Sequence, residues 1–188
     1  MGCTSDKGIG RGTYQPFSKF TCGGSGGNYG GFGGIGLSPT SEFDMECIYF
    51  LKLAEHMPYG LPEDPFFEGS GGGSFDQKSG GVGGGVIIMI SEVFRTDGNI
   101  SADGLSNSDM SSPNPAGAGA GGSIQLYYTV MSGKGNITAD GGYSHTFGGE
   151  GGGGRIKMYF KRWGDNFFYG VHVKYWFGNY SINCGIRK

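Results

Sequence analysis

An internal repeat with an offset of 37 residues limits the folds open to this chain. Residues 86–104 (VIIMISEVFRTDGNISADG) align without gaps with residues 123–141 (SIQLYYTVMSGKGNITADG), and a third copy begins within residues 151–160 (GGGGRIKMYF). A glycine tract precedes the apolar run of each copy, at 80–85, 117–122 and 148–154. Repeats of this kind bury a common face only by stacking on their neighbours, which predicts a stacked, solenoid-like architecture.

Period-two alternation within the copies assigns their residues to columns. Alternate side chains of a strand share one face, so Ile87, Ile124 and Ile156 should form one column. The next column on that face is Met89, Leu126 and Met158, and the columns of the opposite face are Val86, Ser123 and Arg155, then Ile88, Gln125 and Lys157. One face stays apolar in all three copies while the other becomes polar. This pattern predicts parallel, half-buried strands stacked in register.

The second segment of each copy follows the same rule. Ile100 should lie over Ile137, and Ala102 over Ala139, with all four side chains pointing inward. The outward positions are Asn99, Ser101, Asn136 and Thr138. Glycine between these segments suits turns and close backbone approach, because it has no Cβ.

The expected fold class is all-β: a glycine-rich parallel β-helix or solenoid with an irregular N-terminal segment and an aromatic C-terminal cap. The predicted divisions are residues 1–68, the repeats at 69–160 and the cap at 161–188. A short helix is expected within 43–56. A second architecture packs the glycine tracts as polyproline-II-like helices, which need glycine at crowded positions; it ranks lower because the tracts show no strict three-residue period.

The order of glycine tract, short apolar strand, GNI(S/T)ADG, glycine tract and GGGGRIKMYF resembles the glycine-rich β-helical repeats of large cell-surface, adhesin-like and extracellular-matrix proteins of microbial eukaryotes and bacteria. The likeness covers residues 69–160, and CGGSGGNYGGFGG at 22–34 looks like a degenerate further copy. The resemblance implies a structural or adhesive role, commonly in a fibre or coat, and no catalytic residues.

Composition excludes several classes of function. Aromatic residues make up 14% and charged residues only 16%, the reverse of the usual balance in disordered chains. The net charge of −2 provides no broad basic surface for nucleic acid. No apolar run is long enough to span a membrane, which takes about 18 residues.

Four cysteines and three glycosylation sequons favour an extracellular or cell-surface location. The cysteines lack the close pairs of zinc sites, so two disulfides are expected, namely Cys22–Cys47 and a pairing of Cys3 and Cys184 within the chain or with a neighbouring copy. Free buried thiols are the alternative. The sequons begin at Asn99, Asn136 and Asn179. If one copy makes one rung, Asn99 and Asn136 lie about 4.8 Å apart, and at most one of them should carry a glycan.

Motifs for catalysis or cofactor binding are weak. Residues 23–27 satisfy G-x-S-x-G formally, but a nucleophile elbow needs a strand before it and a helix after it. The histidines, His56, His145 and His172, lie in separate segments. Asp103 and Asp140 repeat in register and could bind Ca²⁺, although turn-forming Asp beside Gly explains them equally well. No cofactor and no metal are therefore expected.

These features predict a non-enzymatic structural subunit of an extracellular fibre, coat or matrix. Copies of the chain itself are the expected partners, joined through the solenoid ends. Carbohydrate is the alternative ligand, because aromatic side chains such as Trp163 and Trp176 can stack on sugar rings. The basic and aromatic residues of this region could also bind single-stranded nucleic acid, which the acidic balance disfavours. A polysaccharide-active β-helix enzyme ranks last, since its acids would have to converge on one face.

Overall fold

The computed structural model describes residues 2–12, 23–36, 57–75, 78–107, 116–144 and 147–161, together with the backbone of two strands at 168–173 and 182–183. These residues are all-β, with no helix among them. The helix expected within 43–56 lies outside the described residues. No helix of the described part is long and apolar enough to cross a membrane.

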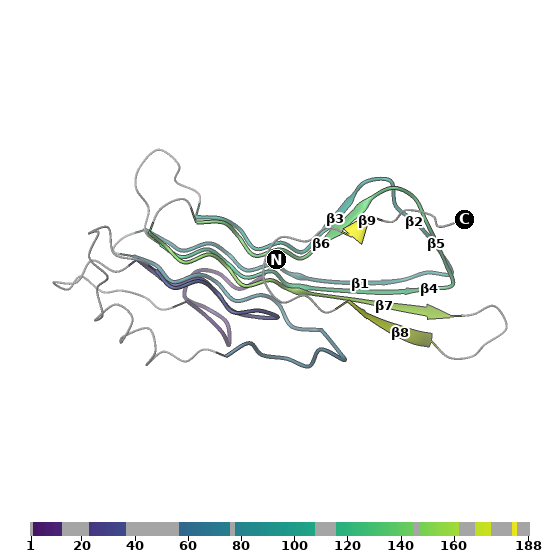
Figure 1. Ribbon diagram of the computed structural model, residues 1–188, viewed down its shortest axis with the longest axis horizontal. Helices are drawn as coiled ribbons and strands as arrows, with labels where there is room; N and C mark the ends of the chain where they lie inside the picture. The colour runs from purple at the N-terminus through teal and green to yellow at the C-terminus, as the bar shows by residue number, and fades with distance from the viewer. Residues whose placement is uncertain are drawn as a thin grey trace.

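The described residues form nine strands in three sheets, which occupy one end of the molecule (Figure 1). They are β1 (Val86–Ile90), β2 (Val93–Arg95), β3 (Asn99–Ser101), β4 (Ser123–Tyr128), β5 (Val130–Ser132), β6 (Asn136–Thr138), β7 (Arg155–Lys161), β8 (Phe168–Val173) and β9 (Ile182–Asn183). The sheets have the strand orders β1-β4-β7-β8, β2-β5 and β3-β6-β9. Each strand of the first copy therefore lies beside its equivalent in the second copy.

The register of the strands confirms the predicted columns. Strands β1, β4 and β7 are parallel, and Ile87 pairs with Ile124, which pairs with Ile156. Asn99 pairs with Asn136 in the parallel β3–β6 pair, as the offset of 37 requires. The inward face is apolar in all three copies, because each copy has a large apolar side chain at the same two positions of its strand.

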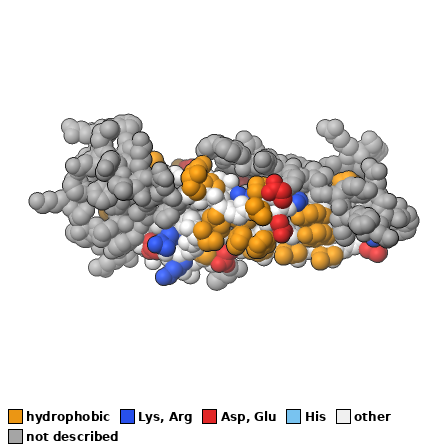
Figure 2. Space-filling view, turned by 90° about the horizontal axis from the view of Figure 1, so that it is seen from below, with side chains coloured by type: hydrophobic (Ala, Val, Ile, Leu, Met, Phe, Trp, Pro, Cys, Tyr) orange, Lys and Arg blue, Asp and Glu red, His pale blue; other side chains and the backbone are white. Residues whose placement is uncertain are grey.

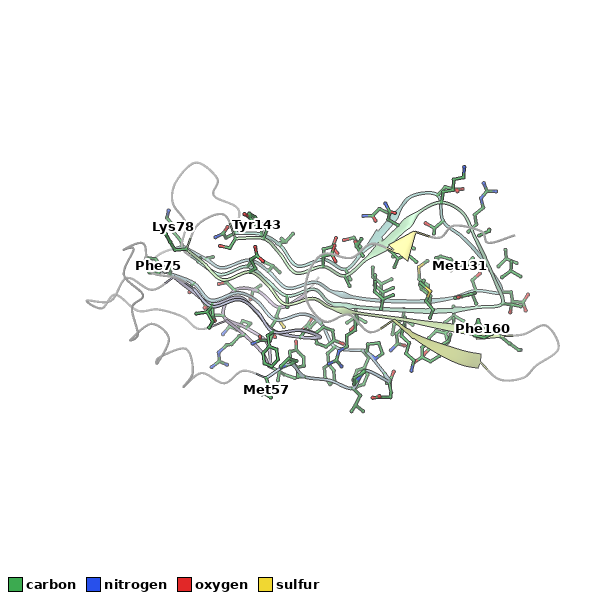
Figure 3. All side chains as sticks on the ribbon, viewed as in Figure 1. Met57, Phe75, Lys78, Met131, Tyr143 and Phe160 are labelled. Carbon is green, nitrogen blue, oxygen red and sulfur yellow. The ribbon has the colours of Figure 1, made fainter. Side chains whose placement is uncertain are left out.

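The core lies between the three sheets, under these columns. Ile124, Leu126 and Ile137 are fully buried, whereas Ile87 on the outermost strand is half-buried. The buried cluster consists of Phe94, Ala102, Ile124, Leu126, Ile137, Ala139, Ile156 and Met158. Met131 of β5 points toward it from the next sheet (Figure 3). The inward positions are therefore buried on β4, β6 and β7 as predicted, whereas on the outermost strand Met89 is 38% exposed.

The glycine tracts form a bundle at the other end of the molecule, where they run side by side without helix or strand hydrogen bonding (Figure 1). In the tract 117–122, successive backbone N–H groups donate in rotation to three neighbouring segments. Gly117 and Ala120 donate to 70–73, Ala118 and Gly121 to 149–152, and Gly119 and Gly122 to 102–105. A three-residue rotation is the geometry of a polyproline-II helix, which has three residues per turn.

The same tract accepts hydrogen bonds from three other segments, so it has six hydrogen-bonded neighbours. These donors are Gly81 and Gly84 to its carbonyls at 117 and 120, Gly27 to the carbonyl of Ala118, and Gly142 to that of Gly119; Arg155, next to the segment 149–152, also donates to the carbonyl of Gly122. Packing at this density leaves no room for a side chain at many of the glycines: a Cβ added at Gly121 would collide with the carbonyl oxygen of Ala139. The glycine tracts thus follow the arrangement that ranked second on sequence, and the closed coil of a β-helix is not shown by the described residues.

Candidate functional site: the β1 edge

Strand β1 is the outermost strand of its sheet and is apolar on both faces. Its sequence is VIIMI, and the only sheet neighbour of β1 among the described residues is β4. The outward side chains Val86, Ile88 and Ile90 are 39%, 54% and 76% exposed. Natural sheets protect exposed edges with charges, proline or bulges, and β1 has none of these. This unprotected apolar edge, Val86–Ile90, is the β1 edge.

The outward positions of the inner strands have the opposite character. Where β1 has Ile88, the register places Gln125 on β4 and Lys157 on β7. The predicted half-buried strands would leave this polar face uncovered, but the face is covered here: Gln125 is 3% and Lys157 7% exposed.

The segment 57–68 covers these polar side chains and binds them through its backbone. The Gln125 amide donates to the carbonyl of Pro65 and to the carboxylate of Asp64, both at 2.9 Å. The Lys157 ammonium donates to the carbonyl of Glu63, and the Ser123 hydroxyl to that of Phe67. Polar residues are needed here because a buried carbonyl requires a donor. Among the described residues, no such segment covers β1, whose outward side chains are apolar.

A row of two stacked tyrosines continues the outward column of Ile90 across the sheet, onto β4 and β7. Ile90 pairs with Tyr127, which pairs with Tyr159, and the two rings are parallel with centroids 4.2 Å apart. The Lys157 ammonium lies 4.5 Å from the Tyr159 centroid. Burial, followed by the contact with Tyr159, raises the pKa of Tyr127 to about 12. The row is therefore uncharged at neutral pH, and it joins the β1 edge as one apolar and aromatic strip. Figure 2 shows hydrophobic groups gathered on the lower face of the molecule, with acidic and basic groups among and beside them.

The copies are also joined by side chains that bind across the offset of 37. Asp97, Asp103 and Ser106 each accept a hydrogen bond from the backbone N–H of the equivalent residue in the next copy: Lys134 at 3.3 Å, Asp140 at 2.7 Å and Tyr143 at 3.0 Å. The register is thus specified by polar contacts as well as by the apolar columns.

The two ends of the stacked copies differ. At the far end, β8 pairs antiparallel with β7, and β9 pairs antiparallel with β6. At the near end, the described residues provide no strand beside β1, β2 or β3. Val93 on β2 is 66% exposed there. Among the described residues, all three sheets have an open edge at the near end, whereas at the far end only the β2–β5 sheet has no added strand, and Val130 on β5 is 46% exposed there.

The predicted glycosylation sites fall partly within the described residues. Asn99 and Asn136 are both exposed and lie directly opposite each other on neighbouring strands. The premise of the prediction, one rung per copy, is therefore correct at this position. Asn179 lies outside the described residues.

Of the four cysteines, only Cys3 lies within the described residues, and it has a free thiol. Its Sγ donates a hydrogen bond to Glu68 Oε1 at 3.0 Å. Burial, and then this contact with the Glu68 carboxylate, raises the pKa of Cys3 to about 12. The thiol is therefore protonated and weakly nucleophilic at neutral pH. Cys22, Cys47 and Cys184 lie outside the described residues, so both disulfides stay predictions.

The remaining candidates acquire structural explanations. The Asp103 carboxylate accepts hydrogen bonds from Ser101, Thr138 and the Asp140 backbone, so it is used between copies. In the described part of the chain, no cluster of His, Cys, Asp or Glu could hold a metal ion. The tract at 23–27 is neither followed by a helix nor preceded by a strand among the described residues. His56 and His145 lie outside them, and His172 is in β8.

The sequence carried a signal for the β1 edge that its column analysis did not use. Val86 and Ile88 are apolar at positions where the later copies have Ser123, Gln125, Arg155 and Lys157. No comparable signal marks the segment 57–68 as the cover of the polar face. No protein-family model, curated protein or solved structure matches this chain.

Proposed function

We propose that this chain is a non-enzymatic structural module that assembles by strand pairing through the open end of its stacked copies. The observation that carries the proposal is the β1 edge, a strand with an exposed apolar side chain at each outward position. An exposed strand edge offers unpaired backbone groups to another strand, and its apolar side chains gain free energy when they are covered. Strand addition to a sheet edge is a common mode of protein recognition.

The stacked copies support a solenoid-type module for this role. The three strands of the first copy, β1, β2 and β3, lie in three different sheets, as the sides of one coil would. Each pairs with its equivalent in the second copy. A coil of this kind buries its face only against another coil, so an uncovered terminal coil favours association.

An extracellular or cell-surface location belongs to the same proposal. Its support is the exposure of Asn99 and Asn136, since an acceptor asparagine must be accessible to be glycosylated. The fibre, coat or matrix setting follows from the repeat and from the resemblance to glycine-rich surface proteins.

Carbohydrate binding ranks second. Sugars stack on the faces of aromatic rings, but the Tyr127 and Tyr159 rings face each other, and Lys157 lies over Tyr159. The aromatic residues of the predicted cap, on which this alternative depends, lie mainly outside the described residues. A polysaccharide-active enzyme ranks third.

Sedimentation velocity over a range of protein concentrations tests the proposal. Wild-type protein should associate, and Ile90→Lys should shift the association to higher concentration because it places a charge on the β1 edge. Ile9→Lys is the matched control, since Ile9 is 64% exposed and lies in the N-terminal segment away from β1. A wild-type protein that stays monomeric throughout, or an equal effect of both variants, would refute the proposal.

A further inference from the structure

We infer that the β1 edge is covered by the β1 edge of a second copy, paired antiparallel about a twofold axis at Ile88. The result is a closed dimer. This inference rests on the proposed function, because it names the occupant of the same surface.

The far end of another copy is a poor match for the β1 end. A head-to-tail contact would have to meet the edges of β1, β2 and β3 together. At the far end, β8 extends one sheet and β9 another, both antiparallel, while the β2–β5 sheet has no added strand among the described residues. A twofold contact does not need the two ends to match, because each copy contributes the same surface, its β1 end. The contact is complete after two copies.

The face alternation of β1 specifies the register of the pair. A shift of one residue would place inward side chains opposite outward ones, so only registers centred on a residue are suitable. Among these, centring on Ile88 pairs all five residues of β1. Val86 then lies opposite the partner's Ile90, and Ile87 opposite the partner's Met89. The inward column of each copy, Ile87 and Met89, is thereby covered by the other.

Charge also favours β1 as the self-pairing strand. β1 contains no charged residue, and in the same register Glu92 would lie across from a glycine, the partner's Gly84. The equivalent pairing of β7 would place Lys157 opposite itself, where like charges oppose association. Of the three parallel strands, only β1 can pair with itself without burying polar or charged outward side chains.

A charge-exchange experiment at Ile88 tests the twofold register. Ile88→Lys and Ile88→Glu should each be monomeric in sedimentation equilibrium, because each opposes a like charge across the axis. An equimolar mixture of the two should regain the dimer mass. Ile9→Lys and Ile9→Glu are the matched control and should remain dimeric separately. Circular dichroism should show the wild-type spectrum for every variant, since Ile88 is 54% exposed.

Cysteine cross-linking gives an independent reading in the otherwise unchanged chain. Under mild oxidation, Ile88→Cys should form a disulfide-linked dimer that the wild-type chain, with its own cysteines, does not form, because directly opposed residues have Cα atoms about 5.5 Å apart, within the range of disulfides. Ile90→Cys should not cross-link to itself, although it is more exposed. In this register the two copies of residue 90 are separated by about 14 Å, which is four residues at about 3.4 Å each.

The outcomes separate the dimer from the broader proposal. A wild-type mass that doubles and then stays constant, with rescue by mixing, supports the dimer. A mass that keeps rising with concentration, or cross-linking at Ile90 but not Ile88, overturns the dimer and leaves association through β1 standing. A wild-type chain that is monomeric at every concentration overturns both.

Discussion

At the scale of single residues, the absence of a side chain matters most in the bundle. In the tract 117–122, alanine and glycine alternate at first and are not interchangeable. Ala118 and Ala120 are completely buried, so their methyl groups are accommodated. Gly121 has the carbonyl oxygen of Ala139 where its Cβ would be, and Gly153, in the neighbouring tract, has no atom within 4 Å of that position. Whether alanine or only glycine fits at a position therefore depends on the segment packed against that position, and not on the tract to which it belongs.

This difference predicts the stability of two matched variants. Gly121→Ala should lower the free energy of unfolding by about 2 kcal/mol or more, since overpacking of a dense interior costs about 1–3 kcal/mol. Gly153→Ala should be neutral or stabilising by roughly 0.5 kcal/mol, because alanine restricts the unfolded chain. Urea denaturation of both variants would measure the effect. Equal losses in the two would show that the collision at Gly121 is relieved by movement of the backbone.

At the scale of strands, the apolar columns join the copies. Ile124 is fully buried between Ile87 and Ile156, which are its direct partners on the neighbouring strands. The outward column of the same strands is polar only where segment 57–68 covers it. The burial of the inward face therefore comes from the repeat itself, whereas the outward face is buried by segment 57–68, which lies outside these strands.

A charge in the inward column should unfold the module. Ile124→Asp buries a carboxylate with no cation at that position, and such substitutions commonly cost more than about 4 kcal/mol, a large part of the total stability of a domain. Val93→Asp, on an exposed position of β2, should change stability little. Thermal unfolding followed by circular dichroism distinguishes them. Retention of the wild-type melting temperature by Ile124→Asp would contradict the assigned core.

The paired sequons give a second prediction at this scale. Asn99 and Asn136 are opposite each other on adjacent strands, which are spaced about 4.8 Å apart. Two branched glycans would collide at this spacing, so at most one of the two asparagines should be glycosylated in any molecule. Mass spectrometry of intact glycopeptides from protein secreted by a eukaryotic host would show this. A peptide population carrying sugar on both would mean that the strands separate before modification.

At the scale of the whole molecule, the repeat predicted the sheets but not their surroundings. The offset of 37 residues gave the pairing of β1 with β4 and of β3 with β6, because register follows from alternation. The burial of Gln125 and Lys157 could not be predicted, since their partners share no pattern with them: Asp64 and Pro65 lie 61 and 60 residues before Gln125, and Glu63 lies 94 residues before Lys157. The β1 edge was predictable from the column positions of Val86 and Ile88.

The three-residue period of the bundle is absent from the order of its residues, so the sequence favours a β-helix over polyproline-II packing. The three-residue rotation is a property of backbone hydrogen bonds, and Ala116, Ala118 and Ala120 interrupt any glycine period without interrupting the rotation. A tract can satisfy the geometry with alanine wherever a neighbour leaves space. The high glycine content therefore indicated close packing of backbone segments. The order of the residues could not distinguish a β-helix from a polyproline-II-like bundle.

The six-neighboured packing of tract 117–122 also determines how such an architecture can grow. A β-sheet extends in one dimension, because a new strand can join only at an edge and must match its register. A bundle of polyproline-II-like tracts extends in two dimensions, since any outer tract offers donors and acceptors toward several directions. Segments from outside the repeat, such as 23–28, join it through the same backbone bonds as the repeats themselves. A bundle of this kind can gain further layers when short glycine tracts are added anywhere in the sequence, because they join through backbone hydrogen bonds and need no matching side chains.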